Sequence, residues 1–109
     1  MTSQEKLKAK ATRLADLITY QEGAIVSRTL IDNEAGTITI FAFDKGQGLS
    51  EHTVPYDAMV QVLEGEVNVF ISGNPTPVKQ GEITVMPANK PHALTAVSKF
   101  KMLLTLIRS

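Results

Sequence analysis

The sequence predicts an all-β domain, a small barrel preceded by a short N-terminal helix. Three observations lead to this prediction. From Ala24 onward, β-branched and aromatic residues occur in short runs of strand length. Turn residues separate these runs, with five of the seven glycines between Gly46 and Gly81 and all five prolines between Pro55 and Pro91. Seven such runs in about eighty residues are typical of a closed or nearly closed β-structure.

The first 23 residues are predicted to form a helical segment ahead of the barrel domain, which spans residues 24–109. Leu7, Ala11, Leu14 and Ile18 recur at helical spacing, while basic residues occupy the other faces. We therefore expect a short amphipathic helix that packs on the barrel or on a partner subunit.

Seven strands are expected in the barrel, each from a run rich in β-branched or aromatic residues. They span residues 24–31, 37–43, 58–63, 67–71, 82–86, 93–97 and 100–107. The stretches around Gly65 and Gly81 resemble each other, and in each a glycine precedes a new strand. We expect both glycines to adopt positive φ in hairpin turns.

Length and composition limit the possible functions. A chain of 109 residues has the size of one domain. With 11 basic and 11 acidic residues it carries no net charge, so neither nucleic acid nor an anionic membrane is an expected partner. The absence of cysteine fits a reducing compartment. No apolar stretch resembles a signal peptide or a transmembrane span, and we expect a soluble, cytoplasmic protein.

Two stretches of the chain each place one histidine in a fixed pattern of glycines and prolines. The first, residues 46–65, contains His52, and the second, residues 81–92, ends in His92. Together they resemble the two motifs of the cupin superfamily, in particular the small single-domain cupins of the type 2 conserved barrel family. The resemblance implies a double-stranded β-helix, or jelly-roll, barrel. Asn89 stands where the motif has glycine, and asparagine tolerates positive φ better than most residues.

The same resemblance implies a site inside the barrel. Complete cupins hold a metal ion there with three histidines and a glutamate. At these four positions the chain has His52, Val54, Ala58 and His92, so two of the usual ligands are substituted. If the strand alternates regularly, side chains two residues apart share the inner face. The predicted pocket is lined by His52, Val54, Tyr56, Ala58, Val60 and His92.

Whether the site has a third metal ligand depends on the strand alternation at Pro55. Proline cannot donate to a sheet ladder and often marks a bulge, so the alternation could slip by one residue and bring Asp57 inward. With regular alternation, Asp57 is a solvated carboxylate instead. Gln61 and Tyr56 are further donors. The predicted metal ligands are His52, His92 and Asp57, for iron, manganese, nickel or zinc.

Three functions fit this site. In the first, an apolar pocket binds a small organic ligand whose polar end meets the two histidines. In the second, His52, His92 and Asp57 hold a divalent metal for a dioxygenase, isomerase or decarboxylase reaction. In the third, which resembles the metal-free sugar epimerases, His52 acts as a general base. The residues do not identify a substrate.

Two predicted strands, 37–43 and 100–107, carry apolar residues on both faces. A lone barrel buries only one face of each strand, so the outer face needs a second layer or a partner chain. We therefore expect a homodimer formed through a sheet face.

Overall fold

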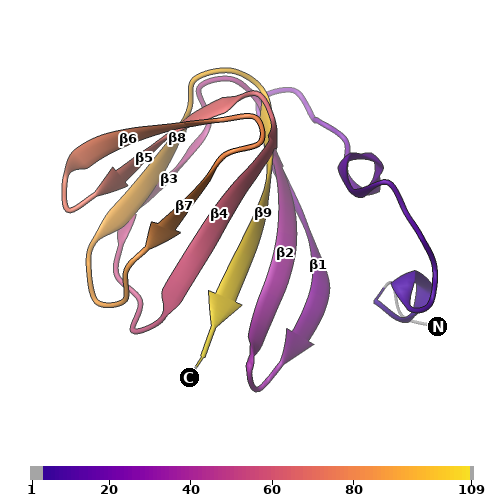
Figure 1. The fold of residues 1–109 in the computed structure, drawn as a ribbon. Helices are drawn as coiled ribbons and strands as arrows, with labels where there is room; N and C mark the ends of the chain where they lie inside the picture. Colours follow the sequence, from indigo (N-terminus) through magenta and orange to yellow (C-terminus); the bar gives the residue numbers. More distant parts are fainter. Residues whose placement is uncertain (1–3, 109) are drawn as a thin grey trace.

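The computed structural model describes residues 4–108 and folds them into two antiparallel sheets (Figure 1). In spatial order, the larger sheet contains β1 (Ile25–Asn33), β2 (Gly36–Phe43), β9 (Phe100–Ile107), β4 (Asp57–Glu64) and β7 (Ile83–Met86). The smaller sheet contains β3 (Gly48–His52), β8 (His92–Ala96), β5 (Glu66–Ile71) and β6 (Asn74–Lys79). The all-β prediction is confirmed, with the two sheets arranged as a jelly roll.

The core lies between the two sheets and follows from alternation along the strands. In β4, Ala58, Val60 and Val62 are buried, whereas the residues between them are partly exposed. Phe43 and Phe100 lie opposite each other on β2 and β9, and their rings stack at 4.6 Å between centroids. Burying a valine or phenylalanine side chain stabilises the fold by about 1.5–3 kcal/mol. The inner faces therefore hold the sheets together.

Two strands, β3 and β6, were not among the seven predicted. β6 contains Pro75 and Pro77, which argue against a strand inside a sheet. It lies at the edge of the smaller sheet and pairs only with β5, so prolines are tolerated there. β3 has the sequence GLSEH, which lacks a β-branched pattern.

Gly65 and Gly81 adopt positive φ as predicted, at +80° and +83°, but neither forms a hairpin turn. Gly65 connects β4 to β5, and Gly81 connects β6 to β7, so each glycine lies where the chain crosses from one sheet to the other. A Cβ atom on Gly65 would lie 2.0 Å from the carbonyl oxygen of Lys99. Only glycine fits this corner without a shift of the backbone.

The N-terminal segment forms two single-turn 3-10 helices, η1 (Glu5–Leu7) and η2 (Leu14–Leu17), instead of one amphipathic helix. Ala9 has a φ of +60°, and residues 8–13 are exposed, so no tertiary packing supports a helix there. Further along, Leu14, Leu17 and Ile18 pack on the outer face of the larger sheet. Before η2 the segment projects away from the barrel beside β1 (Figure 1).

No helix formed by residues 4–108 has the length and apolar character needed to cross a membrane.

Candidate functional site

His52 and His92 meet between the two sheets. His52 is the last residue of β3 and His92 the first of β8, and the two residues are paired directly in the sheet. Their ring centroids lie 4.4 Å apart, with an interplanar angle of 72°. The structure thus brings together the two histidines that the sequence motifs single out.

The imidazole of His52 is exposed and oriented by its own strand. Its Nδ1 lies 2.9 Å from the carbonyl oxygen of Ser50. Because a carbonyl can only accept, Nδ1 carries the proton, and Nε2 of the neutral ring keeps its lone pair. His52 therefore offers a hydrogen-bond acceptor or a metal-ligating nitrogen.

His92 is buried, with 4% of its surface exposed. Its Nδ1 makes no well-formed hydrogen bond with any group in residues 4–108. Burial lowers the pKa of His92 below its usual value, the charge of His52 lowers it further, and the main chain of Lys90 acts in the opposite direction. The neutral form of His92 is thereby favoured.

A small cavity of about 60 Å³ opens beside the two rings. It is lined by Leu49, His52, Val54, Ala58, Met86, His92, Leu94, Leu104 and Leu106. Apart from the two imidazoles, the lining side chains are apolar. The cavity lies between the sheets, because these residues come from β3, β4, β7, β8 and β9 and from the β3–β4 connection.

Four of the six residues predicted to line the pocket do so, namely His52, Val54, Ala58 and His92. Tyr56 does not, because residues 53–56 form no strand and the alternation starts again at β4. Val60 faces inward, but it is fully buried in the core beyond the cavity. The prediction missed the leucines of β3, β8 and β9 and Met86 of β7, which reach the cavity from other strands.

Asp57 does not join the histidines. Ala58 lines the cavity, so the neighbouring Asp57 lies on the outer face of β4. Its Oδ1 accepts a hydrogen bond of 2.8 Å from the main-chain N–H of Ala88. Pro55 therefore leaves Asp57 outside the cavity, contrary to the predicted ligand set.

The donor atoms at this cavity do not make a three-ligand metal centre. Within residues 4–108, no group of three histidine, cysteine, aspartate or glutamate side chains is arranged to hold a metal ion. Val54 and Ala58 line the cavity without donor atoms, which leaves two imidazoles. Catalytic metal sites usually have about three protein ligands, so the residues present do not fit the complete site of the family.

The loop before His92 is fixed to the β3–β4 connection. The N–H of Asn89 donates a hydrogen bond of 2.8 Å to the carbonyl of Val54, close to the contact between Ala88 and Asp57. Asn89 adopts a φ of +65°, the conformation expected for a residue that replaces the motif glycine. These bonds hold the loop next to the cavity.

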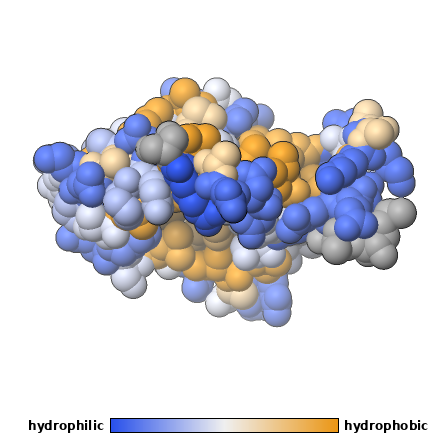
Figure 2. All heavy atoms as spheres, turned by 90° about the horizontal axis from the view of Figure 1, so that it is seen from below, coloured by the Kyte–Doolittle hydropathy of each residue, from blue (hydrophilic) through white to orange (hydrophobic). Residues whose placement is uncertain are grey.

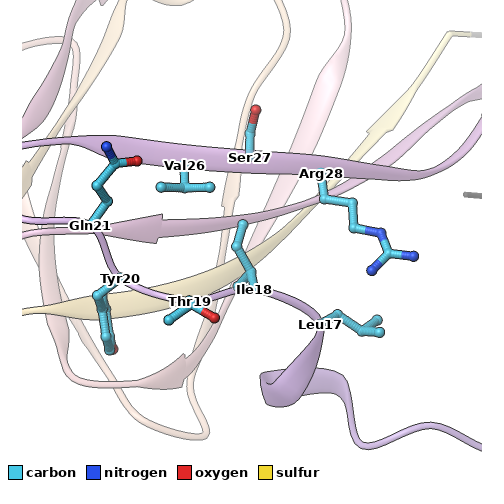
Figure 3. A pocket seen from close by; sticks show the side chains of 8 residues that line it. All are labelled: Leu17, Ile18, Thr19, Tyr20, Gln21, Val26, Ser27 and Arg28. Carbon is cyan, nitrogen blue, oxygen red and sulfur yellow. The ribbon is translucent and has the colours of Figure 1, made fainter.

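Larger hollows lie on the outside of the barrel, away from the histidines. One of about 600 Å³ separates residues 17–21 from β1. In Figure 3, Ile18 and Val26 point into this space, whereas Ser27 points to the opposite side of β1. It is an open groove without a cluster of catalytic groups, so we take the cavity at the histidines as the candidate site.

Comparison with known proteins agrees with the fold. The sequence model of one family, described as Cupin domain, matches residues 39–107. A conserved protein of unknown function from Streptococcus pyogenes is 39% identical, with a TM-score of 0.89, over 93% of this chain and 89% of that one. A cupin superfamily protein from Desulfitobacterium hafniense is 25% identical, with a TM-score of 0.88, over 94% of both chains.

A cupin 2 conserved barrel domain protein from Leptotrichia buccalis is 45% identical, with a TM-score of 0.84, over 86% of this chain. The match spans 46% of that protein. None of the curated proteins matches the sequence significantly.

Proposed function

Because this chain belongs to the cupin domain family, we propose that it binds a small organic molecule in the cavity beside His52 and His92. One observation carries the proposal: the cavity is apolar except for two contacting imidazoles. An apolar cavity with a few convergent polar groups is typical of small-molecule sites.

The size of the cavity limits the ligand. At about 60 Å³ it has room for roughly two water molecules, and typical ligand pockets are several times larger. The part of the ligand that enters is therefore a short apolar group of two or three heavy atoms. The rest of a longer ligand would extend past the exposed His52 into solvent.

The polar end of the ligand follows from the state of His52. Its Nδ1–H is used by the Ser50 carbonyl, so Nε2 is the free acceptor. A hydroxyl or amine donor would satisfy it, whereas a carboxylate can only accept. We propose that a short alcohol binds with its carbon chain among the leucines and its hydroxyl at His52.

The proposal is tested by NMR titration of the protein with short-chain alcohols. Resonances of His52, His92 and Leu104 are expected to shift. Ala58→Val narrows the cavity and should weaken binding roughly tenfold or more, because core sites tolerate added methyl groups poorly. Ala93→Val is the matched control, since Ala93 is half-buried on β8 but does not line the cavity. Unchanged binding in Ala58→Val would rule out this cavity as the site.

A metal-dependent cupin enzyme is the second candidate. The favouring observation is that His52 uses Nδ1 to bond a main-chain carbonyl, as metal-ligating histidines commonly do. Two imidazoles alone would hold a divalent ion weakly. Elemental analysis after reconstitution with iron, manganese, nickel or zinc tests this candidate. Less than about a tenth of an equivalent would exclude it, given how tightly catalytic ions are held.

A further inference from the structure

A groove of about 500 Å³ separates the N-terminal segment from the last residues of β1. Its apolar lining comes from both, with Leu7 and Leu17 on the N-terminal segment and Leu30 and Ile31 on β1. Figure 2 shows hydrophobic side chains at the surface beside the projecting N-terminal segment. The groove has the volume of an ordinary ligand pocket and shares no lining residue with the cavity at the histidines. It is therefore a second, separate candidate site.

A β-bulge in β1 gives the groove two adjacent apolar side chains. The register of β1 against β2 shifts between Thr29 and Ile31, so Leu30 is an extra residue. Leu30 packs against the cluster that contains Ile40, on the outer face of the larger sheet. Ile31 pairs with Ile38, which shares that face with Ile40 because the two are two residues apart on β2. Leu30 and Ile31 thus lie on the same side of the sheet, unlike neighbours in a regular strand.

The size of the groove suits a hydrocarbon chain. At the roughly 30 Å³ that one water molecule occupies in the liquid, the groove holds up to about sixteen non-hydrogen atoms. Apolar surface also continues past it, because Ile31 is 50% exposed and lines a further hollow of about 160 Å³ together with Ile38 and Ile107. A chain that fills the groove can therefore extend over Ile31 into this hollow.

The charged side chains that line the groove are both basic. They are Lys8 and Lys10, and both are exposed. Among residues 4–108, no carboxylate lies within ion-pair distance of either lysine. Glu5 and Asp32 line an adjoining hollow that Lys8 also lines, and Asp32 lies 3.8 Å from Arg108. The two ammonium groups therefore favour an anion, and the two oxygens of one carboxylate can each accept a hydrogen bond from one of them.

We propose that this groove binds a straight-chain monocarboxylate of about eight to twelve carbons. The carboxylate lies at Lys8 and Lys10, and the hydrocarbon chain lies along Leu30 and Ile31. The apolar stems of the two lysines cover part of the chain while their ammonium groups reach the carboxylate. The cavity at His52 takes a different ligand, because the free Nε2 of His52 needs a donor and a carboxylate can only accept. Binding at one site does not require binding at the other.

Titration of the full chain with decanoate, followed by NMR, tests the site. The amide resonances of Leu30 and Ile31 are expected to shift, with a Kd below about 1 mM, and those of His52 should not respond. Shortening the ligand from decanoate to octanoate and then to hexanoate should weaken binding roughly fivefold at each step, because two methylene groups leave the groove each time. Binding that does not saturate by about 5 mM decanoate, or a response at His52 instead of Ile31, would overturn the proposal.

Two isoleucines test the apolar part of the groove. Ile31→Glu removes apolar surface and adds a negative charge, so decanoate affinity should fall roughly tenfold or more. Ile83→Glu is the matched control: Ile83 is 55% exposed at the opposite edge of the larger sheet, and its substitution should change the affinity by less than about twofold. Both variants should unfold at the temperature of the wild type. Equal losses of affinity in the two variants would contradict the assignment of the groove.

The lysines test the recognition of the carboxylate. Combining Lys8→Gln with Lys10→Gln should weaken decanoate binding roughly fivefold, and about 0.5 M salt should cause a similar loss in the wild type. Lys45→Gln is the control, since Lys45 is exposed in the β2–β3 connection. A double variant that binds as tightly as the wild type would exclude a carboxylate at this groove. Sedimentation with phosphatidylglycerol vesicles gives the other arm: a protein that pellets with the vesicles but does not bind free decanoate would replace the proposed ligand by a membrane surface.

Discussion

The hydroxyl of Tyr20 donates a hydrogen bond of 2.6 Å to Oε1 of Glu64, which joins the N-terminal segment to β4. Lys101 strengthens the junction: its Nζ donates to the carbonyl of Ala15 at 2.7 Å and lies 3.6 Å from the same Glu64 oxygen. Burial raises the pKa of Tyr20, and the hydrogen bond to Glu64 and its charge raise it further. The phenol therefore stays protonated and keeps donating well above neutral pH.

Tyr20→Phe should loosen the N-terminal segment. A hydrogen bond to a charged group contributes about 1.5–3 kcal/mol, and part of this is lost because Glu64 is partly exposed and can bond to water instead. We expect the free energy of unfolding to fall by about 1–2 kcal/mol. Hydrogen exchange of the amides in residues 14–20 should accelerate more than exchange in β4.

Tyr56→Phe is the control, since it removes the other tyrosine hydroxyl of the chain outside this junction. Its effect on exchange in residues 14–20 should be negligible. Equal acceleration in both variants would show that Tyr20 does not hold the segment.

Gly65 and Gly81 both lie where the chain crosses between the sheets, and together they test how closely other atoms approach the glycine at such a crossing. Both have φ near +80°, so alanine at either position costs about 1–2 kcal/mol of conformational energy. Only at Gly65 would the new Cβ also meet main-chain and side-chain atoms, within 2.0 Å of the Lys99 oxygen and 2.7 Å of the Cβ of Phe100. At Gly81 it would meet nothing within 4 Å.

We therefore expect Gly81→Ala to lower the free energy of unfolding by about 1 kcal/mol and Gly65→Ala by more than about 3 kcal/mol. Urea denaturation of both variants measures the difference. If the two losses were the same, the corner at Gly65 would have to accommodate a side chain by local rearrangement.

The crossings at Gly65 and Gly81 show which parts of the fold could be predicted from the sequence. The repeated glycine predicts positive φ, because that is a local property of the chain. The turn type could not be predicted, because whether two successive strands pair or cross between sheets depends on the order of all strands. For the same reason, β6 could not be predicted. Pro75 and Pro77 argue against a strand unless it lies at a sheet edge, and the position of β6 at the edge is set by the tertiary structure.

In the candidate site, too, some features could be predicted from the sequence and others depend on the tertiary structure. The resemblance to the cupin motifs implied that His52 and His92 meet inside the barrel and, with regular alternation, that Ala58 faces inward. The remaining lining, such as Leu104 and Leu106 on β9, comes from residues about fifty positions away from His52. Alternation identifies the buried face of a strand, but it does not say which other strand faces it. The position of Asp57 needed the structure, because Pro55 allowed two registers.

Asp57→Ala should release the loop that precedes His92. The carboxylate accepts the Ala88 N–H at 2.8 Å and sits on the outer face, so its removal leaves one main-chain donor to bond with water. We expect a loss of about 1 kcal/mol in the free energy of unfolding and faster hydrogen exchange at Ala88. Asp57→Asn keeps an acceptor oxygen and should retain most of the protection.

Zinc titration of the same two variants also tests the predicted ligand role of Asp57. Because the structure places its carboxylate outside the cavity, neither variant should change zinc affinity by more than about twofold. A loss of roughly a hundredfold in Asp57→Asn would mean that Asp57 turns inward to join the histidines.

The buried His92 should make stability depend on pH. Its pKa in the folded protein lies below the value of about 6.5 expected for an unfolded chain. Below pH 6.5 the unfolded state therefore binds more protons than the folded state, and the free energy of unfolding decreases as the pH falls. Above pH 7 the contribution is fully present and the slope vanishes. Urea denaturation between pH 4.5 and 8 measures this slope. His92→Gln cannot titrate and should flatten the curve below pH 6.5. His52→Gln removes the neighbouring charge, so the pKa of His92 rises toward its ordinary value and the decline should become smaller. If His92→Gln had the same pH dependence as the wild type, the decline would have to come from the acidic residues instead.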